Sequence, residues 1–256
     1  MPEPDLALLE AAAEEAGSFA LARLGAPGKV REKPDGNGPV SETDLAIEAM
    51  LRERLTAARP DYGWLSEESE DDPARLAAAR VFIVDPIDGT RAFLAGQPTW
   101  ALSLAVAEAG RVVAGVVHLP ALGRRYAAAA GAGARANGEP IAVSPRTGLD
   151  GADVLANSSQ FDPRFWPGGV PQVIRHFRPS MAYRFCLVAE GRFDALVTFR
   201  ATWEWDAAAG DLIVREAGGV VSTATGAEPT YNQPQPLLPG VIAAGQAMQA
   251  ALASRL

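Results

Sequence analysis

Apolar residues at helical spacing mark the N-terminal part of the chain. Between residues 5 and 24 they recur every three or four positions with glutamates between them, which predicts an amphipathic helix. A polar stretch rich in glycine and proline covers residues 28–39, which we expect to be a loop. A second predicted helix begins at Ser41-Glu42-Thr43-Asp44 and ends at Pro60.

Short apolar runs typical of strands follow. The run Val81-Phe82-Ile83-Val84 predicts a buried strand that delivers Asp85 at its C-terminal end. Residues 100–107 and 112–118 predict two further strands joined by a hairpin. Helices followed by strands indicate an α+β lobe, which we assign to residues 1–145.

The remaining residues alternate between the two patterns. Alternation of this kind favours an α/β lobe over residues 146–256, and hence an α/β protein of two lobes. The expected strands lie near 154–157, 193–197, 220–222 and 241–244, and the expected helices cover 181–190, 206–217 and the residues from 246 onward.

The charge of the chain excludes one class of partner. The 256 residues include 23 Lys and Arg against 31 Asp and Glu, which gives a net charge of −8. A protein that coats nucleic acid needs clustered basic residues, so we expect no nucleic acid polymer as a partner. Small anions remain possible ligands if metal ions invert the local field.

Cysteine content and hydropathy point to a reducing, aqueous compartment. The chain has one cysteine, Cys186, which cannot form a disulfide within the chain. The acidic residues near Met1 do not resemble a secretory leader, and no run approaches 18 apolar residues. We therefore expect a cytoplasmic protein that does not enter membranes.

The most informative segment is Asp85-Pro86-Ile87-Asp88-Gly89-Thr90. Its two aspartates flank a proline that restricts the backbone, and Gly89 permits a sharp turn. Carboxylates at a strand end can converge on a divalent cation, and the N–H groups at a following helix start can hold a phosphate. The alternative for either aspartate alone is an ordinary Asx-type turn.

Three other acidic positions strengthen the metal-site interpretation. Glu67 follows an apolar run, Asp44 opens the second predicted helix, and Asp206 opens a later one. Singly, Asp44 and Asp206 would be helix caps and Glu67 a solvated charge. Capping does not account for their joint occurrence with the segment at residues 85–90.

Together these motifs resemble the three signatures of the inositol monophosphatase superfamily. The likeness runs from Ser41-Glu42-Thr43-Asp44 to Glu216-Ala217-Gly218-Gly219, nearly the whole chain, and includes Glu67-Glu68-Ser69 and Trp205-Asp206-Ala207-Ala208-Ala209-Gly210. The resemblance implies a layered αβαβα sandwich and Mg²⁺-dependent hydrolysis of a small phosphorylated substrate. It also implies inhibition by Li⁺ and a possible homodimer.

The resemblance further implies a set of two to three Mg²⁺ ions. A donor set made only of oxygens, with no His or Cys, also favours Mg²⁺ over Zn²⁺. One ion would take Glu67, Asp85 and the carbonyl oxygen of Ile87, and a third, weaker ion would rest on Glu67 through water. The second ion would take Asp85, Asp88 and Asp206.

Carried over in the same way, the catalytic residues are Asp44, Glu67 and Thr90. Asp44 and Thr90 would orient and deprotonate the attacking water. The N–H groups of Gly89 and Thr90 would hold the phosphate. Cations that lower the pKa of a bound water and neutralise developing charge make a covalent intermediate unnecessary.

Details of the sequence favour a 3'(2'),5'-bisphosphate nucleotidase of the CysQ type, which converts 3'-phosphoadenosine 5'-phosphate to AMP. Ser66 before Glu67 and Glu204 before Trp205 are similar to the nucleotidases. Arg184 stands where those enzymes carry a lysine, and a cation there could bind a second phosphate. The alternative for Arg184 is a surface cation of a helix.

Other details favour other substrates. Gly89-Thr90-Arg91-Ala92-Phe93 is similar to the histidinol-phosphate phosphatases, and Ser180 replaces a glycine typical of the nucleotidases. Phe199 stands where inositol phosphatases place a glutamate that binds ring hydroxyls. Inositol-1-monophosphatase and histidinol-phosphate phosphatase therefore remain alternatives. A regulatory binding protein on the same scaffold is the alternative outside enzymes, which the intact acidic set disfavours.

Overall fold

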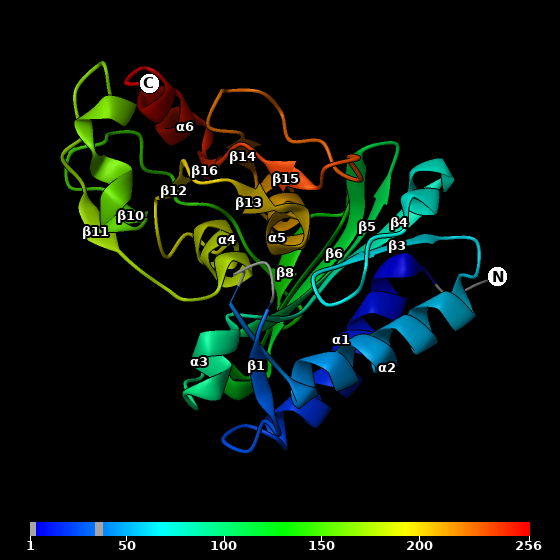
Figure 1. Ribbon diagram of the computed structural model, residues 1–256. Coiled ribbons are helices and arrows are strands. Elements are labelled where there is room, and N and C mark those ends of the chain that lie inside the picture. Colours follow the sequence, from blue (N-terminus) through cyan, green and yellow to red (C-terminus); the bar gives the residue numbers. More distant parts are fainter. Residues whose placement is uncertain (1–3, 34–37) are drawn as a thin grey trace.

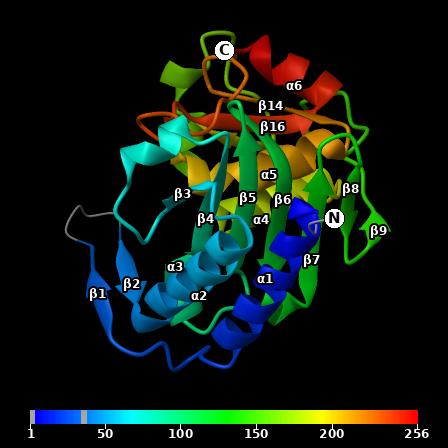
Figure 2. The same ribbon diagram turned by 90° about the vertical axis from the view of Figure 1, so that its right-hand side faces the viewer.

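The larger sheet lies between two layers of helices (Figures 1 and 2). The computed structural model describes residues 4–33 and 38–256. Within this sheet β3 runs parallel to β4, and the other neighbouring strands are antiparallel. In spatial order its strands are β3 (Gly63–Ser66), β4 (Arg80–Asp88), β5 (Ala101–Glu108), β6 (Arg111–Leu119), β7 (Arg124–Ala129), β8 (Ala134–Ala136) and β9 (Glu139–Pro140).

Two long helices cover the outer face of this sheet. α1 (Asp5–Leu21) packs on β6, and α2 (Glu42–Ala58) contacts α1 and β4. α2 begins with a capping box, in which the Ser41 side chain accepts a hydrogen bond from the Asp44 backbone and the Asp44 side chain accepts one from the Ser41 backbone. The local sequence therefore fixes both the start of α2 and the orientation of a buried carboxylate.

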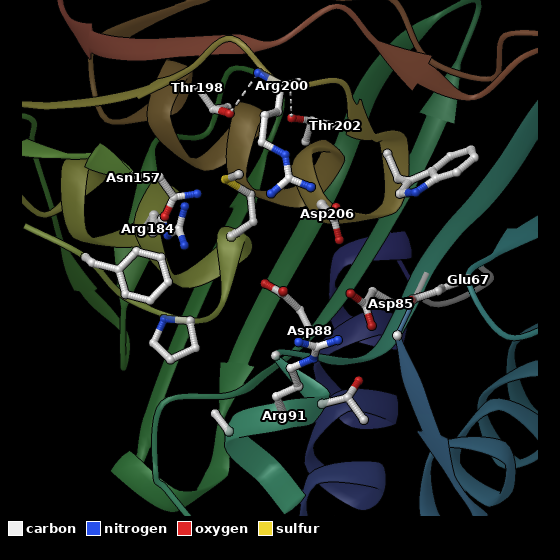
Figure 3. Close-up of a pocket in the computed structure, with 18 of the residues that line it drawn as sticks. Glu67, Asp85, Asp88, Arg91, Asn157, Arg184, Thr198, Arg200, Thr202 and Asp206 are labelled. Atoms are coloured by element: carbon white, nitrogen blue, oxygen red, sulfur yellow. Dashed lines mark hydrogen bonds between the residues drawn. The ribbon is translucent and has the colours of Figure 1, made fainter. Parts of the chain in front are cut away.

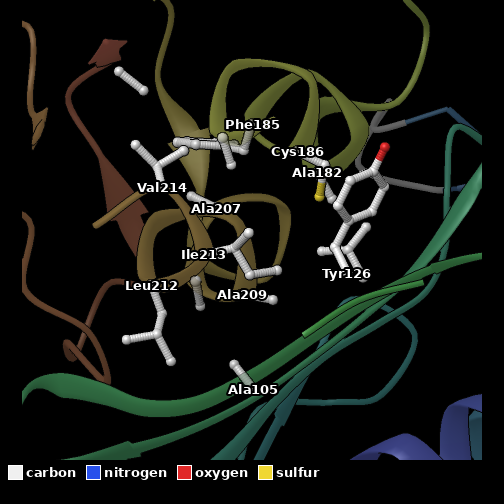
Figure 4. Packing of buried hydrophobic residues seen from close by; sticks show 14 of the residues in the cluster. Ala105, Tyr126, Ala182, Phe185, Cys186, Ala207, Ala209, Leu212, Ile213 and Val214 are labelled. Atoms are coloured by element: carbon white, nitrogen blue, oxygen red, sulfur yellow. The ribbon is translucent and has the colours of Figure 1, made fainter. Parts of the chain in front are cut away.

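Two helices form a middle layer against the inner face. α4 (Met181–Ala189) and α5 (Glu204–Glu216) contact each other, and α5 also contacts β5 and β6. Figure 4 shows the small residues of α5 in this core, with Phe185 and Cys186 of α4 beside them. A Cβ atom on Gly210 would lie 2.5 Å from the Phe185 Cβ, so the close approach of the two helices requires glycine there.

A second sheet and a last helix complete the layers. In this sheet β10 is parallel to β11 and β12, whereas β16 is antiparallel to β12 and β14. α6 (Gln246–Ala253) packs on β16 and β14, so the order of layers is αβαβα, as the family resemblance implies. The strands, in spatial order, are β11 (Ile174–His176), β10 (Asp153–Leu155), β12 (Ala195–Thr198), β16 (Val241–Gly245) and β14 (Gly219–Ser222).

Among the described residues, no helix has both the length and the apolar character needed to cross a membrane.

Shorter elements connect these layers. The remaining elements are β1 (Val30–Glu32) paired with β2 (Pro39–Ser41), β13 (Thr202–Trp203) paired with β15 (Leu237–Leu238), α3 (Thr90–Leu94), and short 3-10 helices over Pro73–Ala77, Pro120–Leu122, Ser158–Phe161 and Pro163–Phe165.

Several predicted boundaries were wrong. The expected loop over 28–39 contains β1 and the start of β2, although part of it, residues 34–37, lies outside the described residues. β4 does not end before Asp85 but continues to Asp88, because it keeps pairing with β5 across an irregularity in the register. The first helix ends at Leu21 rather than Leu24, and α5 begins at Glu204.

The division into lobes 1–145 and 146–256 stays a prediction. The two large sheets do fall on either side of residue 145. α5, however, contacts strands of both sheets.

Candidate active site

A cavity of about 640 Å³ opens where β4 meets the N-terminal ends of α4 and α5 (Figure 3). The turn between β12 and β13 lines its far side. Asp44 and Ile87 contact Thr90, which lies in the lining. The other residues predicted for the site all line the cavity: Glu67, Asp85, Asp88, Gly89, Arg184 and Asp206.

Three carboxylates from distant parts of the chain converge in this cavity. Glu67 follows β3, Asp85 lies in β4, and Asp206 lies in the first turn of α5. One oxygen of each lies within 4.8 Å of those of the other two. The fold thus brings together side chains that the sequence separates widely.

Asp85 has unfavourable surroundings for a negative charge. It is 1 % exposed, and among the described residues neither of its carboxylate oxygens has a hydrogen-bond partner. Burial raises its pKa well above the usual range, and Glu67, Asp88 and Asp206 raise it further. A buried carboxylate without partners is costly, so this cluster suits a hard divalent cation.

Asp206 is perturbed for the same reasons. Burial raises its pKa well above the ordinary value, and the charges of Asp88 and Glu67 add to this effect. All three carboxylates would be stabilised together by a cation between them, because it would offset both burial and mutual repulsion.

Asp88 lines the cavity but points partly away from this cluster. Its Oδ2 atom accepts hydrogen bonds of 2.6 Å from the Ser180 hydroxyl and from the Ala182 backbone N–H, at the start of α4. Burial raises its pKa to about 6, although these hydrogen bonds and the charge of Arg184 oppose the rise. In the described part of the chain, the group within 4.8 Å consists of Glu67, Asp85 and Asp206, without Asp88.

Asp44 both caps a helix and reaches the site. Its Oδ2 atom accepts hydrogen bonds from the backbone N–H and the hydroxyl of Ser41. The Thr90 hydroxyl lies 3.4 Å from Asp44 Oδ1 and 3.1 Å from the Ile87 carbonyl oxygen, and can donate its one hydrogen to either acceptor. Burial raises the pKa of Asp44, against the effect of the Ser41 hydrogen bonds.

Gly89 makes the sharp turn between β4 and α3. Its φ angle is 93°, in the left-handed region that favours glycine. This turn directs Thr90 back toward Asp44. A side chain at Gly89 would strain the backbone of the site itself.

Lys33, which no sequence motif indicated, also lies at the site. Its ammonium group lies 2.6 Å from an oxygen of Glu67 and 2.9 Å from one of Glu68. Burial lowers the pKa of Lys33, but the two glutamates outweigh burial and leave it above the usual value. Burial and the charge of Glu67 raise the pKa of Glu68 to about 7. No local pattern marks Lys33, because its contacts depend on the β1–β2 pairing.

The alternative that Arg184 is a surface cation was wrong. Arg184 is 5 % exposed, and its Nε atom donates to the Arg178 carbonyl at 2.5 Å. Its guanidinium lies 4.5 Å from the centre of the Phe177 ring. Burial lowers the pKa of Arg184, against the effect of the charges of Asp88 and Asp206.

Comparison with known proteins assigns the family. The model of the inositol monophosphatase family matches residues 1–256. The chain belongs to the inositol monophosphatase family. This family is one of phosphatases, and the chain is assigned to that class of enzyme.

Curated relatives within the family differ in their named substrates. A histidinol-phosphatase of Chlorobaculum parvum is 35 % identical over 225 residues, which cover 84 % of each chain. An inositol-1-monophosphatase of Rhizobium meliloti is 37 % identical over 201 residues, or 73 % of each chain. The family assignment therefore leaves the nucleotidase subtype a prediction.

A solved structure supports the same fold. An IMPase of Thermotoga maritima superposes with a TM-score of 0.82 at 30 % identity, covering 96 % of this chain and 94 % of that one. The αβαβα arrangement is therefore that of an inositol monophosphatase family member.

Proposed function

We propose that this phosphatase hydrolyses a small phosphate monoester with the help of Mg²⁺. The observation that carries the proposal is the convergence of Glu67, Asp85 and Asp206, with both oxygens of Asp85 buried and unpaired. Asp88 and the Ile87 carbonyl would complete the ligand set. When bound, Mg²⁺ supplies a water of lowered pKa and neutralises charge on the reacting oxygens.

The protein's own groups would position the nucleophile and the phosphate. The Thr90 hydroxyl, held between Asp44 and the Ile87 carbonyl, can accept a hydrogen bond from the attacking water and pass a proton to Asp44 Oδ1. The N–H groups of Gly89 and Thr90 precede the first hydrogen-bonded turn of α3 and can donate to phosphate oxygens. The scissile phosphate would therefore lie between this turn and the acidic cluster.

For the substrate we propose a 3'(2'),5'-bisphosphate nucleotide. Arg184 supports this choice, because it places a buried cation in the same cavity as the acidic cluster. Phe199, where an inositol enzyme would need a carboxylate, packs on Phe165 with 4.5 Å between ring centres. Histidinol phosphate is the second candidate, favoured by the histidinol-phosphatase relative.

Release of inorganic phosphate tests both levels of this proposal. The panel is 3'-phosphoadenosine 5'-phosphate, histidinol phosphate, inositol 1-phosphate and fructose 1,6-bisphosphate, each with Mg²⁺ and with excess EDTA. We expect turnover only with Mg²⁺ and the highest kcat/KM for the nucleotide. Turnover that persists in EDTA would contradict the metal role, and a higher kcat/KM for histidinol phosphate would replace the proposed substrate.

A further inference from the structure

A second arginine that the sequence did not single out lines the cavity beside Arg184. Arg200 lies in the turn between β12 and β13, and its side chain extends into the cavity on the side of Arg184 and Asp206 (Figure 3). The cavity thus has an acidic end at Glu67 and Asp85 and a basic wall formed by Arg184 and Arg200. The acidic end and the basic wall come from different elements of the fold.

The backbone of Arg200 is fixed, whereas its side chain is exposed. The Arg200 N–H donates to the Thr198 hydroxyl at 3.3 Å, and the Thr202 hydroxyl donates to the Arg200 carbonyl at 3.1 Å. Within the part of the chain that the structure describes, the Arg200 guanidinium has neither a hydrogen bond nor an ion pair. This arrangement positions a free cation over the cavity.

Arg184 is a buried cation that forms no ion pair with any described residue. Only its Nε atom has a hydrogen-bond partner, and no carboxylate of residues 4–33 or 38–256 lies within 4.0 Å of its guanidinium. The Phe177 ring and the Arg178 carbonyl fix the plane of the group. A buried charge without a partner is unfavourable, so an anion at this wall would stabilise it.

Cations at the acidic end would increase this demand for an anion. The carboxylates of Asp88 and Asp206 attract Arg184, while the charge of Arg200 repels it. Metal ions bound to those carboxylates would cancel the attraction and leave the two arginines in excess. Two guanidinium groups present planar sets of donors that match phosphate oxygens. The cavity volume of about 640 Å³ lies within the range for small-molecule and cofactor sites.

We propose that Arg200, together with Arg184, binds a second phosphate group of the substrate and selects bisphosphates over monophosphates. This inference rests on the proposed function and adds Arg200 as its specificity-determining residue. The scissile phosphate occupies the acidic end and the second phosphate the basic wall.

A matched pair of substrates isolates the second phosphate. Adenosine 3',5'-bisphosphate and adenosine 3'-monophosphate share the same 3' ester and differ only in the 5' group. A hydrogen bond to a charged group contributes about 1.5–3 kcal/mol, so Arg200→Gln should lower kcat/KM for the bisphosphate by about 10- to 150-fold. For the monophosphate, kcat/KM should change less than about threefold, because the variant leaves the acidic end intact.

Two further variants complete the comparison. Arg200→Lys should keep part of the preference, since it retains the charge but not the planar donors. Arg175→Gln is the matched control, because Arg175 is an exposed arginine of β11 that does not line the cavity. It should leave the ratio of the two kcat/KM values unchanged.

Binding without turnover separates this inference from the proposed function. In EDTA, isothermal titration should show adenosine 5'-monophosphate binding more tightly than adenosine, and Arg200→Gln should remove the difference. Equal binding of the two ligands to the wild-type protein would overturn the inference, as would equal losses of kcat/KM for both substrates in Arg200→Gln. An absence of Mg²⁺-dependent turnover on every phosphate ester would instead overturn the proposed function. Binding of adenosine 5'-monophosphate that depends on Arg200 would still support the anion-binding role of the basic wall in that case.

Discussion

Replacing Asp206 by asparagine is expected to stabilise the metal-free protein while weakening its response to Mg²⁺. The variant keeps the size of the side chain and removes one of three charges whose oxygens lie within 4.8 Å of one another. With an effective dielectric constant of about 20, two unit charges at this distance repel by about 3 kcal/mol. This repulsion destabilises the folded state, either directly or by forcing one of the carboxylates to take up a proton.

One smaller effect reduces the expected gain. Asp206 lies in the first turn of α5, where a negative charge stabilises the helix by about 0.3–1 kcal/mol. A net gain of about 2 kcal/mol in the free energy of unfolding remains. For a chain of this size, that corresponds to a rise in Tm of about 4–8 °C.

Calorimetry at pH 8 measures the effect directly. In EDTA the Tm of Asp206→Asn should exceed that of the wild-type protein, and the rise in Tm on adding Mg²⁺ should be smaller in the variant. Asp61→Asn is the control, because Asp61 is exposed and lies outside the cavity. A Tm in EDTA that is unchanged or lower for Asp206→Asn would refute the electrostatic reasoning, as would an undiminished response to Mg²⁺.

Three other predictions concern the turn and the acidity of the site. Thr90→Ala should lower kcat by about 10²- to 10⁴-fold and change KM little, because the hydroxyl that links the attacking water to Asp44 is lost. Thr90→Ser keeps the hydroxyl and should keep most of the activity. An unchanged kcat for Thr90→Ala in steady-state assays would make Thr90 only a turn residue. Gly89→Ala should lower the free energy of unfolding by about 1–2 kcal/mol in urea titrations, because the φ angle of Gly89 is 93°. Gly148→Ala should leave it unchanged, because Gly148 lies in open space and has no left-handed backbone. Equal effects of the two substitutions would contradict backbone strain at residue 89. In EDTA, the free energy of unfolding should fall as pH rises from about 4 toward 7, because carboxyl groups with raised pKa values, such as Asp88 at about 6, bind more protons in the folded than in the unfolded state. Mg²⁺ should flatten this slope. A free energy of unfolding that rises over this range, or a slope that does not respond to Mg²⁺, would contradict the assignment of the acidic cluster as a metal site.

Local patterns predicted the features that depend on local chemistry. The spacing of proline, glycine and aspartate in Asp85-Pro86-Ile87-Asp88-Gly89-Thr90 constrains the backbone by itself, so this segment could be identified as a site. The segment Ser41-Glu42-Thr43-Asp44 likewise predicted the start of α2, where the structure shows a capping box. The approach of Asp206 to Asp85 followed from the family resemblance rather than from any local pattern.

Features set by tertiary contacts could not be predicted in this way. β1 has three exposed residues, so no alternation of buried and exposed positions marked it as a strand. Arg200 looks like any exposed loop arginine until the turn between β12 and β13 places it over the cavity. The hydrogen bond from Ser180 to Asp88 joins residues that are 92 positions apart.

The most direct test of the central claim is anomalous diffraction from crystals soaked in Mn²⁺ as a substitute for Mg²⁺. The acidic cluster predicts a strong peak between Asp85 and Asp206, with Glu67 as a further ligand, and the loss of that peak in Asp85→Asn. Wild-type crystals that show Asp85 and Asp206 without any metal peak between them would contradict a metal-dependent phosphatase site.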